Sequence, residues 1–290
     1  MRRILALAAA ALVAPALAMA APATAHAAPG AAKPVPSNPV DALRQQFGKK
    51  TGVHMDTTVD MRLGGDDLLK FRQVGSLRFG KSGVDAYDLK RIVDLGKGKD
   101  TLHLIALNGK AYMQSPLYDE MLPADKKWVR TPGSKAPSTN DTIDILRPAV
   151  LKTVLASTKV KRAGGTVGGA RTTLYTGAVK VGELSKVSTE IEAMAEVFKL
   201  KKNVTLPWKL WIGADQLPRR FQSTFPMGKV PHAGRLTVDA DSRYTAWGAK
   251  VVITAPPADQ VIDEKDLTTD LPETTPDFTK VVPSLTAGRH

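Results

Sequence analysis

The stretch VHMDTTVDMRL, residues 53–63, decides the fold of this chain. Its odd positions are Val, Met, Thr, Val, Met and Leu, and its even positions are His, Asp, Thr, Asp and Arg. Successive side chains of a strand point to opposite faces of a sheet, so this alternation predicts a β-strand with one dry face.

The segments that follow extend the same pattern. Phe71, Leu77 and Phe79 alternate with polar residues after a turn at 64–67, and two further runs cover 84–95 and 101–107. Asn108-Gly109 closes the last run, and this dipeptide is a strong signal for a two-residue hairpin turn. We therefore expect an antiparallel meander.

Helical spacing occurs in three places. Asn38-Pro39 combines a capping residue with proline at the first helical position, and Pro148 is expected to kink or restart a helix over 143–154. Apolar residues spaced by three and four predict an amphipathic helix over 183–199. Alternation returns from Val204 to Ile253. The fold class is therefore α+β, a large antiparallel sheet that carries helices on one face.

The N-terminus has the pattern of a secretory signal peptide over 1–27. A short cationic start precedes an apolar run that is too short to span a membrane, and Ala25-His26-Ala27 is a cleavage site of the Ala-x-Ala type. We expect a secreted, extracytoplasmic protein with a flexible lead-in over 28–37, a single domain over 38–265 and a Thr/Pro-rich tail over 266–290.

Composition restricts the possible partners. The chain has no cysteine and a formal net charge of +13. Outside the cell, this charge favours anionic lipid head groups or wall polymers over nucleic acid, although plain solubility explains it equally well.

The sequence contains no convincing catalytic motif. Residues 75–82, GSLRFGKS, match the P-loop pattern, but Leu77 and Phe79 alternate as strand residues, and Gly83 follows where a helix would begin. No histidine pairing suggests zinc, and no nucleophile motif is present. We therefore expect no enzyme activity, no cofactor and no metal site.

The apolar residues allow two interpretations. Trp208 and the methionines on dry faces either fill an ordinary core or line a pocket that accepts a flexible acyl chain, to which methionine adapts well. Composition does not separate these two cases.

Three stretches together resemble a known family. They are 108–112 continuing to 127–129, LWIGADQLPRR at 210–220, and YTAWG at 244–248 running into VVITAPPADQV at 251–261. Their order and spacing resemble the LppX/LprG-type lipoproteins, relatives of the LolA/LolB lipoprotein carriers, over about 38–265. Members of that family begin with an acylated cysteine, which this chain lacks.

The resemblance implies a curved, half-open β-barrel whose concave face is covered by helices around a lipid-binding cavity. On that basis we expect a monomeric carrier of lipid or an acylated ligand; the alternative is a sensory or wall-polymer-binding module of the same fold. By strand alternation and helix spacing, the cavity residues are expected to be Val53, Met55, Val59, Met61, Phe71, Leu77, Trp208, Leu210, Ile191, Met194 and Phe198.

Overall fold

The computed structural model describes residues 36–49, 51–94, 98–132, 143–230 and 233–267 of the 290. Twelve strands and four α-helices occur in these ranges, together with short 3₁₀ turns. The helices are α1 (Pro39–Arg44), α2 (Pro148–Ala156), α3 (Val181–Leu184) and α4 (Thr189–Val197). The strands are β1 (Thr51–Leu63), β2 (Asp66–Phe79), β3 (Val84–Asp94), β4 (Lys99–Leu107), β5 (Lys110–Gln114), β6 (Trp128–Pro132), β7 (Thr158–Val167), β8 (Ala170–Lys180), β9 (Thr205–Gly213), β10 (Pro218–Val230), β11 (Gly234–Lys250) and β12 (Val261–Asp263).

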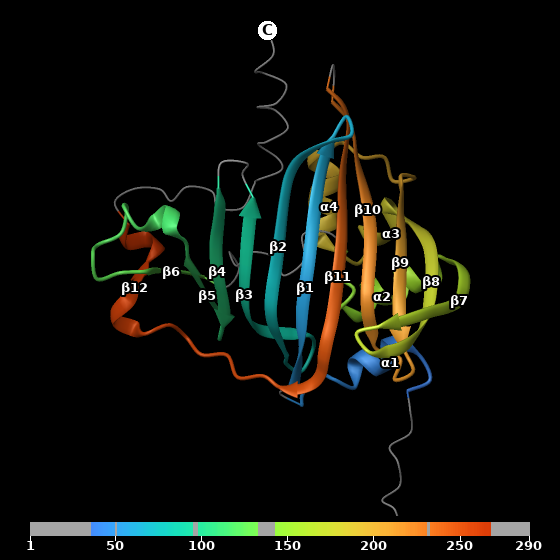
Figure 1. Cartoon of the computed structure of the whole chain (residues 1–290), viewed down its shortest axis with the longest axis horizontal. Helices are drawn as coiled ribbons and strands as arrows, with labels where there is room; N and C mark the ends of the chain where they lie inside the picture. The colour runs from blue at the N-terminus through green and yellow to red at the C-terminus, as the bar shows by residue number, and fades with distance from the viewer. Residues whose placement is uncertain (1–35, 50, 95–97, 133–142, 231–232, 268–290) are drawn as a thin grey trace, which may run out of the picture. The chain divides into compact units, whose positions relative to one another are not determined.

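All the strands belong to one sheet in the order β12-β6-β5-β4-β3-β2-β1-β11-β10-β9-β8-β7 (Figure 1). Neighbouring strands are antiparallel except β12 and β6, which are parallel. The strand predicted over 53–63 lies at the centre, where β1 pairs with β2 on one side and with β11 on the other. The expected large antiparallel sheet is confirmed.

The helix cap and the turns predicted from the sequence are present at the expected residues. The Asn38 side chain accepts a hydrogen bond from the Asp41 amide and caps α1. Asn108 and Gly109 both have positive φ, 53° and 71°, as a type I′ hairpin between β4 and β5 requires. The P-loop-like segment is a strand that runs into a turn, since β2 ends at Phe79 and the Gly80 amide donates to the Gly83 carbonyl.

Two expected elements differ in detail. The helix predicted over 183–199 is two helices, α3 and α4, because Ser188 takes an extended conformation and its hydroxyl caps α4 by accepting from the Ile191 amide. The helix expected over 143–154 begins only at Pro148, the first residue of α2, and residues 143–147 before it are not helical.

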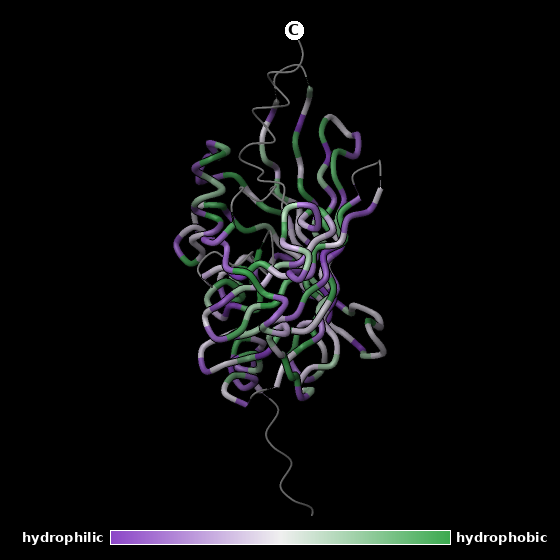
Figure 2. The backbone as a smooth tube through the Cα atoms, turned by 90° about the vertical axis from the view of Figure 1, so that its left-hand side faces the viewer, coloured by the Kyte–Doolittle hydropathy of each residue, from purple (hydrophilic) through white to green (hydrophobic). Residues whose placement is uncertain are grey.

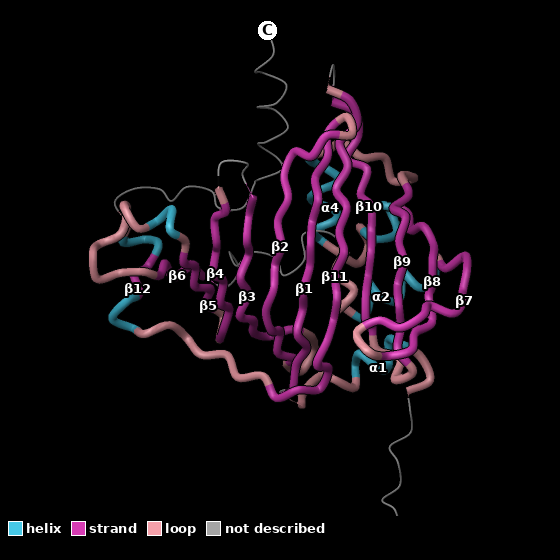
Figure 3. The backbone as a smooth tube through the Cα atoms, in the orientation of Figure 1, coloured by secondary structure: helices cyan, strands magenta, loops and turns pink. Residues whose placement is uncertain are grey.

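The inner face of the sheet, defined as the face that carries the odd positions of β1, packs against the helices. Figure 3 shows the helices behind β7–β11, and Figure 2 shows hydrophobic and hydrophilic residues alternating along the strands. Side chains from the inner face and from α1–α4 form one buried apolar cluster. The sheet and the helices are therefore two layers with a common core.

The outer face is different in its two halves. Across β1, β2, β10 and β11 it carries ion pairs, such as the bidentate contact of Arg72 with Asp56 at 2.7 and 2.8 Å. Across β3–β6 it carries a second apolar cluster that contains Ile253 and Trp128 and is covered by the segment 251–261, which returns along the sheet to β12. Within the described ranges, no helix is long and apolar enough to cross a membrane.

Candidate functional site

The residues expected to line a cavity all lie on the inner face or on the helix that covers it. Nine of them belong to the buried apolar cluster, and Met194 and Phe198 are half-buried against it. The nine are Val53, Met55, Val59, Met61, Phe71, Leu77, Ile191, Trp208 and Leu210. Strand alternation and the helix stripe thus select residues that the fold brings together in one apolar core.

A row of polar side chains crosses this apolar layer. Arg91, Gln73, Thr57 and Ser242 are direct cross-strand neighbours on β3, β2, β1 and β11, and all are buried. The Thr57 hydroxyl donates to Ser242 Oγ at 2.9 Å, and Arg91 Nε donates to Gln73 Oε1 at 2.9 Å. Pairing of this kind is what makes burial of polar groups tolerable in a core.

Beside this row, Tyr244 is 0% exposed, yet its hydroxyl makes no hydrogen bond within the described part of the chain. The Ser242 hydroxyl is near enough to affect Tyr244 ionisation, but the two groups do not meet in hydrogen-bonding geometry. Burial raises the pKa of the Tyr244 phenol, and the charge of Asp144 adds to that rise. A buried donor without an acceptor costs free energy, which makes this hydroxyl a feature that needs an explanation.

A cavity of about 470 Å³ opens between the sheet and the helical layer. Residues of the turn at 82–85 and of the hairpin at 107–110 form much of its lining. Tyr87 and Ala106 contribute from β3 and β4, Asp144 and Arg147 from the segment before α2, and Glu190 from α4. Arg147 Nη1 donates to Glu190 Oε2 at 2.7 Å across this opening. We call this cavity the mouth, because its walls come from both layers of the fold.

Asp144 is the most perturbed carboxyl of the mouth. Its Oδ1 accepts a hydrogen bond from the Leu146 amide at 3.0 Å. Burial raises the pKa of Asp144 from 3.8 to about 6. The Leu146 amide and Arg147 oppose this rise in the pKa, and Glu190 adds to it. Asp144 therefore connects the mouth to Tyr244, on whose phenol its charge acts.

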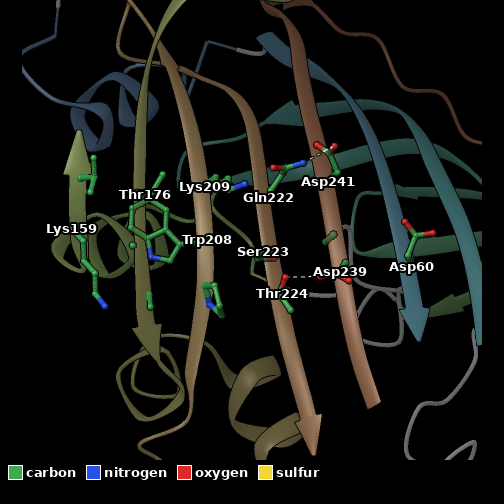
Figure 4. A pocket seen from close by; sticks show the side chains of 15 residues that line it. Asp60, Lys159, Thr176, Trp208, Lys209, Gln222, Ser223, Thr224, Asp239 and Asp241 are labelled. Carbon is green, nitrogen blue, oxygen red and sulfur yellow. Dashed lines mark hydrogen bonds between the residues drawn. The ribbon is translucent and has the colours of Figure 1, made fainter. Parts of the chain in front are cut away.

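A larger groove of about 590 Å³ lies mainly over polar side chains of the outer face (Figure 4). Asp60, Asp239 and Asp241 lie on its neighbouring strands, but each already has a basic partner: Lys70 at 3.0 Å, Arg62 and Arg220, respectively. Thr224 and Gln222 also donate to two of these carboxylates. The three carboxylates of the groove are therefore all paired.

Metal-binding chemistry has no visible support in the described ranges, where no group of three or more potential ligands occurs. His103 Nε2 contacts Asp88 Oδ1 at 2.7 Å on the outer face. His232 and His290 lie outside the described residues.

Sequence reasoning missed the mouth and most of the polar row. Thr57 was placed on the dry face by its odd position, and the same parity within β3 places Arg91 between Leu89 and Val93. Parity was therefore the available signal for Arg91. The meeting of Tyr87, Asp144 and Glu190 has no such signal, because these residues come from three distant segments.

Comparison with known proteins gives matches by structure only. No protein-family model matches the chain, and neither does any curated protein. LprF from Mycobacterium bovis aligns with 77% of this chain and 99% of its own length, at 14% identity and a TM-score of 0.41. Lipoprotein LppX from Mycobacterium tuberculosis aligns with 74% and 98%, at 13% identity and a TM-score of 0.38.

A LolA superfamily protein from Nitrosomonas europaea aligns with 74% of this chain and 93% of its own, at 8% identity and a TM-score of 0.26. LppX gives its name to the family that the sequence motifs resemble, and the LolA proteins are the relatives named with that family. The function proposed below rests on this chain's own residues.

Proposed function

We propose that this protein binds the acyl chains of a lipid between the inner face of its sheet and helix α4, and carries that lipid outside the cytoplasmic membrane. The observation that carries the proposal is the mouth, which opens between the two layers of an apolar core. On this proposal the inner face is the concave wall of a half-open barrel, and the eleven residues expected from the sequence line the acyl site.

Helix α4 is suited to act as a lid because the protein holds it weakly. Of its nine residues only Ile191 is buried, while Val197 is 43% exposed and Met194 is half-buried. A short helix that buries one side chain gains little from packing and can detach at low cost. Displacing it would uncover apolar surface beside the mouth.

The energetics of acyl binding are favourable in magnitude. Burial of a methylene group is worth about 0.8 kcal/mol, so a chain of 16 carbons gains roughly 12 kcal/mol before the costs of ordering the chain and moving the lid. The surplus over those costs would set the affinity.

Location and partners complete the proposal. Residues 1–27 would direct export, and the mature protein would act as a monomer outside the cytoplasmic membrane. Its basic balance would attract it to anionic membrane or wall surfaces.

Native mass spectrometry of protein purified from its own secreting host tests this function directly. Acyl lipid that co-purifies with the folded protein and is released by solvent extraction is the expected result. A protein that is consistently free of lipid, and that takes up no palmitoyl ester when incubated with one, would overturn the proposal.

A charge placed on the inner side of the lid is expected to abolish lipid retention without unfolding the protein. Met194→Lys puts an ammonium group against the acyl site, and desolvating that charge beside a hydrocarbon chain is costly. The half-buried position lets the lysine reach solvent when no lipid is bound. We expect at least a tenfold loss of bound lipid by native mass spectrometry.

Ala193→Lys is the matched control, because Ala193 is exposed on the same helix and receives the same charge. It should retain lipid as the unmodified protein does. Equal lipid content in both variants would show that α4 does not cover the acyl site.

A further inference from the structure

The Tyr244 hydroxyl is a buried hydrogen-bond donor without an acceptor within the described residues. Removing it from water without a partner costs free energy that a phenylalanine at the same position would not cost. The position itself does not demand a hydroxyl, because Tyr244 packs in the apolar cluster and contacts Trp247 at a ring-centroid distance of 6.2 Å. The packing alone would be served by phenylalanine.

The surroundings of this hydroxyl indicate where an acceptor would come from. Tyr244 lies opposite Met55, one of the residues assigned to the acyl site, and two residues along β11 from Ser242 in the polar row. Asp144, which lines the mouth, is near enough for its charge to act on the Tyr244 phenol. The hydroxyl therefore lies beside a residue assigned to the acyl site and within electrostatic reach of a residue that lines the mouth.

The charges near the entrance restrict the chemistry of that polar end. Arg147 is paired with Glu190 and Asp85 with Arg78, while Lys110 is exposed at the start of β5. The charge that acts on Tyr244 is that of the Asp144 carboxyl. A carboxylate or phosphate brought next to Asp144 would be repelled. An uncharged acceptor, such as the carbonyl oxygen of an ester, fits both the donor and the charges.

We propose that the Tyr244 hydroxyl donates a hydrogen bond to the ester carbonyl oxygen of the bound acyl lipid and so selects esters over other long-chain molecules. This assignment rests on the proposed function and adds to it the atom that recognises the ligand. In the free protein the hydroxyl lacks a partner among the described residues, and ligand binding supplies one.

Two probes that differ in one carbonyl group test the assignment. Methyl palmitate and hexadecyl methyl ether have chains of the same length, and only the ester has a carbonyl oxygen. We expect the unmodified protein to bind the ester roughly five- to tenfold more tightly in competition native mass spectrometry, the preference that one net hydrogen bond gives. In Tyr244→Phe this preference should disappear, and both probes should still bind.

Tyr244→Phe is expected to weaken ester recognition but to raise the stability of the ligand-free protein. Loss of a partnerless buried hydroxyl should raise the Tm of the ligand-free protein by roughly 2–4 °C. Thr51→Val is the matched control: the Thr51 hydroxyl is also buried without a partner among the described residues, but it lies four residues along β1 from Met55, about 13 Å away. It should keep the ester preference intact.

Each other outcome overturns a defined part of the proposal. A lower Tm in Tyr244→Phe would show that the hydroxyl has a partner within the protein. An unchanged ester preference in that variant, or tighter binding of palmitate than of its methyl ester, would overturn carbonyl recognition while leaving lipid binding in place. Failure of the unmodified protein to bind methyl palmitate, hexadecyl methyl ether or palmitate would overturn the proposed function as well.

Discussion

Replacing Asp144 with asparagine is expected to stabilise the folded protein by up to about 3 kcal/mol at pH 7–8, and to leave its stability near pH 3.5 almost unchanged. Burial raises the pKa of this carboxyl from 3.8 to about 6. The folded protein therefore binds a proton that the unfolded chain releases between these two values, and stability falls as the pH rises through that window. Above about pH 6 the whole cost of the buried charge is present.

The substitution removes that cost and retains the local structure. An asparagine side-chain oxygen can still accept the hydrogen bond from the Leu146 amide, and the pair of Arg147 with Glu190 is untouched. Urea unfolding at several pH values between 3.5 and 8 measures the effect. The value of 3 kcal/mol is an upper bound, because Asp144 retains some contact with solvent.

Glu192→Gln is the control for this experiment, since Glu192 is an exposed acid on the neighbouring helix α4. It should shift the stability only slightly and by a similar amount across the pH range. If Asp144→Asn and Glu192→Gln gave the same profile, Asp144 would be a solvated carboxyl, and the mouth would be open to water at that point.

Truncating Trp208 to alanine is expected to lower the free energy of unfolding by about 3–5 kcal/mol. The indole is 2% exposed, and its Nε1 donates to Ser157 Oγ at 2.9 Å. It also fits against Gly177, where an added Cβ would lie 2.6 Å from the indole ring. Loss of the ring would leave a large void and remove the donor to Ser157 Oγ, whose hydroxyl still donates to the Val154 carbonyl at 2.7 Å.

Trp211→Ala provides the comparison on the same strand. Trp211 lies on the opposite face of β9, half-exposed under the Arg220 guanidinium at 5.0 Å from its ring centroid. We expect a loss of about 1 kcal/mol for this variant. Chemical denaturation of the two variants distinguishes the interpretations that composition left open: a small effect at Trp208 would mean that its side chain borders empty space rather than a filled core.

Alternation predicted the sheet well because it acts within a single strand. The run over 53–63 lies within β1, and the parity of its dry positions matches the buried positions of the strand. The ends of helices were harder to predict from the sequence. The break between α3 and α4 depends on the Ser188 hydroxyl, which competes with the backbone for hydrogen bonds. The apolar spacing continues across that break and conceals it.

The polar residues of the candidate site could not be predicted from the sequence, for a different reason. Tyr244 and Asp144 are a hundred residues apart, and nothing in either neighbourhood indicates that one charge acts on the other. Periodicity identifies the face on which a residue lies, but pairing between distant strands decides which polar groups share it. Buried hydroxyls are therefore found only after the strands have been placed.

The position of β1 in the sheet has a consequence for the order in which the chain assembles. Strands β1–β6 can pair one after another as short hairpins, but the second edge of β1 pairs only with β11, as in the contact of Thr57 with Ser242, 185 residues apart. The free edge of β6 likewise pairs only with β12, where Arg130 contacts Asp263.

The segment 234–263 thus closes both open edges of the first half, and it is made after the other strands of the sheet. Until it arrives, two strand edges remain available to any extended chain nearby, and pairings between such distant segments form slowly. Pairing of β11 with β1 and of β12 with β6 covers these two edges. Before that pairing forms, a newly made molecule is most prone to aggregation.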